Sequence, residues 1–94
     1  MLTEHPEPGV IVYIFAKGEG LPLHVHTASD NHETFVETGR IYCWGPAADG
    51  KKWEIEVPAG KRVKFRAEEP HEITALEDGT RIRNVRAELD NARV

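Results

Sequence analysis

The sequence has a single cysteine, Cys43, and it has no long apolar segment. One cysteine cannot form an internal disulfide, so the chain does not belong to the small secreted domains that disulfides stabilise. No apolar run approaches the roughly 20 residues of a membrane-spanning helix, and the first residues lack the basic and apolar regions of a signal peptide. These absences predict a cytoplasmic protein with no membrane partner.

Basic charge is also scarce. The 12 Lys and Arg residues are outnumbered by 16 Asp and Glu residues, which gives a formal net charge of -4. A nucleic-acid-binding domain needs an excess of Lys and Arg to neutralise phosphates, so we expect no nucleic-acid partner. The length of 94 residues is enough for one domain with one modest core and too short for two.

No stretch of the sequence has a sustained helical period. Short apolar or alternating segments recur instead, separated by turns rich in Gly and Pro. Residues Val10–Phe15 are all β-branched or aromatic, and Trp53–Val57 alternates apolar with acidic side chains, both typical of strands. About eight such segments, the last at Arg81–Leu89, predict an all-β sandwich or barrel over residues 10–94. Residues 1–9, with two prolines, are expected to form an N-terminal arm without regular structure.

The five histidines are the main candidates for chemistry. His24 and His26 are two residues apart, so on a strand they lie on the same face, about 7 Å apart along the chain, and can converge on one ion. Imidazole is the most common metal ligand and suits Zn, Fe, Ni and Cu. A His-x-His pair alone is weak evidence, and His32 or His71 taken alone would favour a structural role. His5 lies in the expected arm and is interpreted as exposed.

The surroundings of these histidines resemble the two-part cupin signature. Gly18 precedes His24 by six residues, the His-x-His pair and a loop follow, and Gly39 ends the next segment. Further on, Pro58-Ala59-Gly60 precedes a strand-like segment and then Pro70-His71. The resemblance implies a cupin-type antiparallel β-barrel (a double-stranded β-helix, or jelly roll) that holds one divalent transition metal ion. The combination is specific for the fold and much less so for function.

One ligand position departs from the usual cupin pattern. The position separated from Gly39 by six intervening residues, where the family usually has Glu, is occupied by His32, and Glu33 is one step out of phase. Some cupins have a fourth histidine at this position. The resemblance therefore implies a metal site of His24, His26, His32 and His71, and the ion could be Zn, Fe, Mn, Ni or Cu.

Strand alternation bears on the choice between His32 and Glu33. If His32 points inward, Thr34 and Val36 do so too, and Glu33 and Phe35 face outward. If Glu33 points inward, Glu37 follows it and a second carboxylate is buried, which is costly without a partner. We therefore favour His32, although a β-bulge near the preceding loop could reverse the phase.

Two functional hypotheses follow from this site. The first is a small metal-dependent enzyme, of the dioxygenase or isomerase type found among cupins, acting on a small molecule whose negative charge would suit a site of four neutral histidines. The alternative is a non-catalytic module that binds a small ligand or senses a metal, and a metal-free barrel is a third possibility. No catalytic residue can be named, since Cys43 is interpreted as a small buried apolar residue and Glu72 as a solvated one. Val10–Phe15 is apolar on both faces, which predicts a homodimer.

Overall fold

Every regular element in the part of the chain that the structure describes is a β-strand. The computed structural model describes residues 1–25, 32–66 and 69–86, and no helix in these ranges is long and apolar enough to cross a membrane. The strands in this part of the chain are β1 (Leu2–Glu7), β2 (Val10–Phe15), β3 (Gly20–His24), β4 (His32–Thr38), β5 (Arg40–Pro46), β6 (Lys52–Pro58), β7 (Arg62–Phe65), β8 (His71–Ala75) and β9 (Thr80–Arg86). The prediction of an all-β chain is confirmed.

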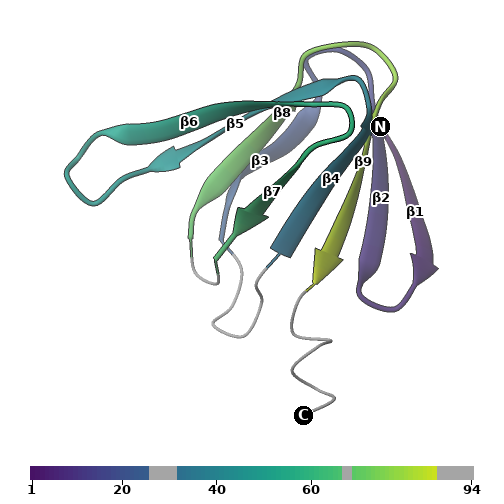
Figure 1. The fold of residues 1–94 in the computed structure, drawn as a ribbon, viewed down its shortest axis with the longest axis horizontal. Coiled ribbons are helices and arrows are strands. Elements are labelled where there is room, and N and C mark those ends of the chain that lie inside the picture. The colour runs from purple at the N-terminus through teal and green to yellow at the C-terminus, as the bar shows by residue number, and fades with distance from the viewer. Residues whose placement is uncertain (26–31, 67–68, 87–94) are drawn as a thin grey trace.

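The strands form two antiparallel sheets that face each other (Figure 1). One sheet has the order β1-β2-β9-β4-β7 and the other has the order β3-β8-β5-β6. Strands that are distant in the sequence are thus neighbours: β9 lies between β2 and β4, and β8 lies between β3 and β5. The chain crosses repeatedly between the sheets, as a jelly roll does. The β5–β6 hairpin projects away from the rest of the molecule (Figure 1).

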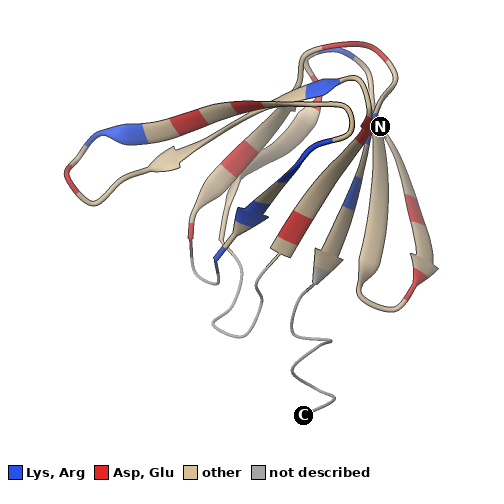
Figure 2. Ribbon diagram, in the orientation of Figure 1, with Lys and Arg blue, Asp and Glu red and all other residues tan. Residues whose placement is uncertain are grey.

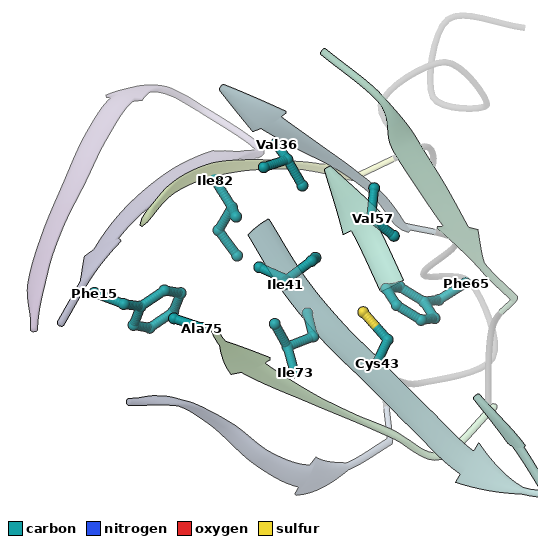
Figure 3. Close-up of a cluster of buried hydrophobic side chains, with 9 residues drawn as sticks. All are labelled: Phe15, Val36, Ile41, Cys43, Val57, Phe65, Ile73, Ala75 and Ile82. Atoms are coloured by element: carbon teal, nitrogen blue, oxygen red, sulfur yellow. The ribbon is translucent and has the colours of Figure 1, made fainter. Parts of the chain in front are cut away.

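The core lies between the two sheets because strand alternation sends every second side chain inward. Burial alternates clearly in β4, β5 and β8, where buried positions are separated by partly exposed ones. Figure 3 shows the resulting cluster, to which both sheets contribute. Its members are Phe15, Val36, Ile41, Cys43, Val57, Phe65, Ile73, Ala75 and Ile82.

Gly39 forms the turn through which the chain passes from β4 in one sheet to β5 in the other. Its φ of 78° lies in the left-handed region, which favours glycine. A Cβ atom at this position would lie 2.8 Å from Cα of Thr80, closer than packing allows. The glycine predicted to end this strand is therefore required both by the backbone angle and by the close approach of β9.

The prediction for the first nine residues is wrong in one respect. Leu2–Glu7 is not irregular but forms β1, which pairs antiparallel with β2, for example Leu2 with Ile14. Proline and acidic residues suggested an unstructured arm, but Pro6 is tolerated here because β1 is the edge strand of its sheet. The other boundaries differ by a few residues, and residues 87–89 of the expected last strand lie outside the described residues.

The outer face of β2 is also less exposed than expected. Val10 and Val12 are buried within the chain, and Ile14 is partly buried. Phe35 does face outward, but the guanidinium carbons of Arg62 and Arg83 lie 5.8 and 5.2 Å from the centre of its ring. The broad apolar patch that motivated a homodimer is thus covered from within.

Charged residues of both signs are distributed along the strands of the five-stranded sheet (Figure 2). Glu37 accepts a hydrogen bond of 2.7 Å from Nε of Arg81, and its other oxygen lies 3.9 Å from Nε of Arg83. Exposed pairs of this kind contribute about 0–1 kcal/mol each. Arg81 and Arg83 alternate with the buried residues Ile82 and Asn84, so both lie on the outer face of β9.

Candidate metal centre

His24 and His71 face each other across neighbouring strands. They are register partners in the β3–β8 pair, where β3 has an irregularity between Leu21 and His24. Their ring centroids are 4.4 Å apart and the ring planes are inclined by 63°. His71 is almost completely buried, with 2% of its surface exposed, and His24 is partly buried. The sequence placed these residues 47 positions apart, and the fold brings their imidazoles into contact.

Backbone carbonyl groups fix the orientation of both rings. Nδ1 of His24 is 2.6 Å from the carbonyl oxygen of Pro22, and Nδ1 of His71 is 2.8 Å from that of Glu69. A carbonyl oxygen only accepts hydrogen bonds, so Nδ1 of each ring carries the proton. The lone pair of the neutral ring is then on Nε2. Metal-binding histidines in proteins commonly have this arrangement, in which the second ring nitrogen donates to a carbonyl group.

Phe65 packs directly against His71. The two rings are parallel within 5°, with centroids 3.8 Å apart, and Phe65 also contacts Trp53 at 6.0 Å between centroids. Phe65 is 2% exposed and belongs to the hydrophobic core. The core thus restricts the position of the His71 ring on one face, while the Glu69 carbonyl group restricts its rotation.

His32 enters from the opposite sheet. It begins β4 and is buried together with Thr34 and Val36, whereas Glu33 and Phe35 are partly exposed. The carboxylate of Glu33 lies 3.4 Å from Arg62 and 3.8 Å from Lys64, on the outer surface. His32 therefore points inward, which is the orientation that strand alternation favoured.

A pocket of about 220 Å³ brings two of the histidines together. His24 from one sheet and His32 from the other both line it. Its remaining wall is formed by Ile11, Tyr13, Leu21, Pro22 and Asn84. His71 does not line this pocket, but its ring contacts the ring of His24, which does. A larger hollow of about 600 Å³ lies on the outer surface around Phe35, and none of the described residues that line it is a histidine.

The structure describes three of the four predicted ligand residues. His26 lies outside the described residues, and within residues 1–25, 32–66 and 69–86 no three His, Cys, Asp or Glu side chains converge as a metal site. His5 lies on the exposed edge strand β1. Coordination by His24, His26, His32 and His71 accordingly remains a prediction.

Cys43 and Glu72 do not belong to the candidate site: Cys43 packs in the core, and Glu72 makes a contact on the outer face. Cys43 is completely buried, and this burial raises the pKa of its thiol to about 12, so it is not a nucleophile at neutral pH. Glu72 is directed outward as expected, but it is not merely solvated, because it accepts a hydrogen bond of 3.0 Å from Nε1 of Trp44.

Sequence reasoning missed Asn84, Tyr13 and Phe65 as parts of the site. Each is an isolated residue in a strand, and its place beside the histidines depends on the register between strands. Asn84 is directly opposite both Ile11 and Thr34 in the neighbouring strands. Its one signal in the sequence is that it is an uncharged polar residue on the same strand face as the apolar residue Ile82.

No model of a known protein family matches the sequence, and no curated protein matches it significantly. Solved structures, in contrast, are clearly similar. Oxalate decarboxylase from Bacillus subtilis, studied for its Mn(II) centres, has 22% sequence identity and a TM-score of 0.72 over 82% of this chain. The formate complex of oxalate decarboxylase from Lactobacillus farciminis has 25% identity and a TM-score of 0.72 over 82% of this chain.

The chain covers only 20% and 22% of the length of those two proteins, so the similarity concerns one domain of a larger molecule. At this identity the similarity establishes the fold. Together with the two facing antiparallel sheets, it shows that the chain has the fold of a small cupin domain, as the sequence signature implied.

Proposed function

We propose that this chain is a metal-binding cupin protein, in which His24, His26, His32 and His71 hold one divalent transition metal ion. The observation that carries this proposal is the His24–His71 pair, whose rings touch and whose Nδ1 atoms both donate to backbone carbonyl groups. Two neutral imidazoles oriented in this way are suited to present Nε2 as a ligand. A structural role alone would not require both rings to have the same tautomer.

Four imidazole nitrogens suit a metal ion of intermediate softness. Imidazole nitrogen binds Zn, Fe, Ni and Cu well, whereas Mn prefers oxygen ligands and would bind more weakly, so affinity and supply together would decide the occupant. A bound ion would supply Lewis-acid chemistry toward a ligand in the pocket. The residues of the chain would orient the ligand and limit its contact with water, because Ile11, Leu21 and Pro22 give the 220 Å³ pocket an apolar wall.

The finer proposal is a small metal-dependent enzyme, of the dioxygenase or isomerase type, that acts on a small anionic molecule. Four neutral histidines would leave the full charge of the ion, which favours an anion. The similar oxalate decarboxylases are named for a small dicarboxylate, which agrees with this class of substrate.

A non-catalytic ligand-binding module is the second candidate, and one observation favours it. Among the described residues, the wall of the pocket has no Asp, Glu, Lys or Arg side chain that could act as a general acid or base. Turnover of small carboxylates and phenols by the metal-loaded protein would support the enzyme. Saturable binding of the same compounds without turnover would support the module.

The metal content of protein purified without a histidine tag tests the site. We expect one ion per chain, a sharp loss in the His26→Ala and His71→Ala variants, and normal content in the His5→Ala control. Full occupancy in a folded His71→Ala variant would contradict the proposed ligand set.

The cytoplasmic location expected from the single cysteine stays a prediction.

The homodimer also stays a proposal, but it now rests on a different surface. Strand β1 is an exposed edge of the five-stranded sheet, and Leu2 on this strand is 66% exposed. Unpaired edge strands are prone to pair with another chain. Sedimentation equilibrium at micromolar concentration should give twice the monomer mass, and the Leu2→Glu variant should shift it toward 10.6 kDa. A wild-type mass of 10.6 kDa would rule the dimer out.

A further inference from the structure

Asn84 is a polar residue at the inner face of the five-stranded sheet. It lies in β9 between Ile11 of β2 and Thr34 of β4, and it is 8% exposed. Ile82, two residues earlier on the same face, belongs to the hydrophobic core. Asn84 therefore stands where the apolar interior ends and the pocket with His24 and His32 begins. A buried amide at such a position requires hydrogen-bond partners.

The side-chain oxygen of Asn84 already accepts a hydrogen bond. The hydroxyl group of Thr34 donates a hydrogen bond of 2.6 Å to Oδ1 of Asn84, and this contact is buried. Thr34 is 1% exposed, so the pair is held firmly by its surroundings. Because the amide oxygen receives this bond, the amide is oriented, and its nitrogen supplies two N–H donors and no acceptor.

The rest of the described pocket wall has no fixed charge. Apart from the two histidines, its lining residues are apolar or uncharged polar groups, and no carboxylate among them would repel an anion. Burial raises the pKa of Tyr13 above its ordinary value, so its phenol is a neutral group at physiological pH. An oriented N–H donor in such a wall discriminates by hydrogen-bonding type, because it donates to a ligand oxygen and leaves a ligand N–H group unpaired.

We infer that this pocket binds a small carboxylate and that Asn84, oriented by Thr34, is the residue that selects it by donating to a carboxylate oxygen. The inference rests on the proposed function in one respect, because the charge of a bound metal ion would offset that of the anion. The donor itself belongs to the chain with or without the ion. The volume of about 220 Å³ is below the roughly 300 Å³ at which pockets for drug-sized ligands begin, so the ligand has only a few carbon atoms.

Acetate is the probe, and the side-chain amide resonance of Asn84 in ¹⁵N-labelled protein is the readout. We expect acetate to shift this resonance saturably in zinc-loaded protein, and more weakly in metal-free protein. Ethylammonium, of similar size but only a donor, should not shift it. If the protein holds no zinc, the proposed function fails, and the metal-free titration then decides the inference by itself. Absence of a saturable shift in both forms would overturn it.

Two variants separate the donor from its surroundings, with binding followed by the shifts of neighbouring backbone amides. Asn84→Asp keeps the size and can still accept from Thr34, but it loses both N–H donors, so the Kd for acetate should rise at least about tenfold. Ala48→Asp adds the same charge in the exposed β5–β6 turn and should leave the Kd unchanged. Thr34→Val removes the orienting hydroxyl group and should also weaken binding. Wild-type affinity in a folded Asn84→Asp variant would refute the role of Asn84.

Discussion

Replacing Phe65 by leucine should separate the stability of the core from the affinity of the metal site. Phe65 makes two ring contacts, with His71 at 3.8 Å and with Trp53 at 6.0 Å between centroids. At about 0.5–1.5 kcal/mol for each ring pair, the Phe65→Leu variant should lose roughly 1–3 kcal/mol of unfolding free energy. Denaturant titration in the presence of a chelator measures this loss without a contribution from metal.

The same substitution should also weaken metal binding. His71 would keep its hydrogen bond to the Glu69 carbonyl group but lose the flat surface that holds its ring. Groups that orient a metal ligand typically contribute about 10- to 100-fold in affinity, so zinc affinity by competition with a chelating dye should fall within that range.

Ile82→Val is the matched control for this experiment. Ile82 is fully buried and lies apart from Phe65 in the core, since β4 separates their two strands (Figure 3). This substitution should cost about 0.5–1.5 kcal/mol of stability and leave zinc affinity unchanged. If Phe65→Leu loses stability but binds zinc as tightly as the wild type, the idea that the core positions His71 is wrong.

Three further outcomes are expected. The unfolded Cys43 thiol ionises near its ordinary pKa of 9.0 while the folded thiol keeps its proton to about 12, so wild-type stability should fall by up to about 1.4 kcal/mol per pH unit between pH 9 and 12. The difference from Cys43→Ala in denaturant titrations isolates this effect, and parallel curves would contradict it. Gly39→Ala should lower the unfolding free energy by more than Gly50→Ala, since both glycines have positive φ but only Gly39 lies against Thr80; equal losses would show that the close approach costs nothing. The zinc-induced gain in Tm should vanish as pH falls toward roughly 5, because a protonated imidazole cannot bind metal, and a gain that is flat from pH 5 to 8 would exclude histidine ligation.

Much of the fold could be predicted because it depends on local patterns. Continuous β-branched segments, alternation and glycine turns located most strands, and the spacing of Gly18, His24, Gly39 and His71 implied the cupin fold. Strand β1 was missed because its proline and acidic residues are untypical of strands in general, although an edge strand that pairs on one side tolerates them.

The site was less predictable because it depends on which residues face each other across strands. Alternation alone favoured His32 over Glu33 for the inward position, and burial agrees. The Asn84–Thr34 pair joins residues 50 positions apart, and only the register between β4 and β9 brings them together. No local pattern encodes that register.

X-ray absorption spectroscopy at the zinc edge of the zinc-loaded protein can establish whether histidines hold the metal ion, because it identifies the ligand atoms. We expect a first shell of nitrogen ligands at about 2.0–2.1 Å, with the outer-shell scattering that imidazole rings produce. This scattering should weaken in the His71→Ala variant and persist in His5→Ala. A sulfur shell at about 2.3 Å, or an oxygen shell without imidazole scattering, would contradict a metal ion held by histidines.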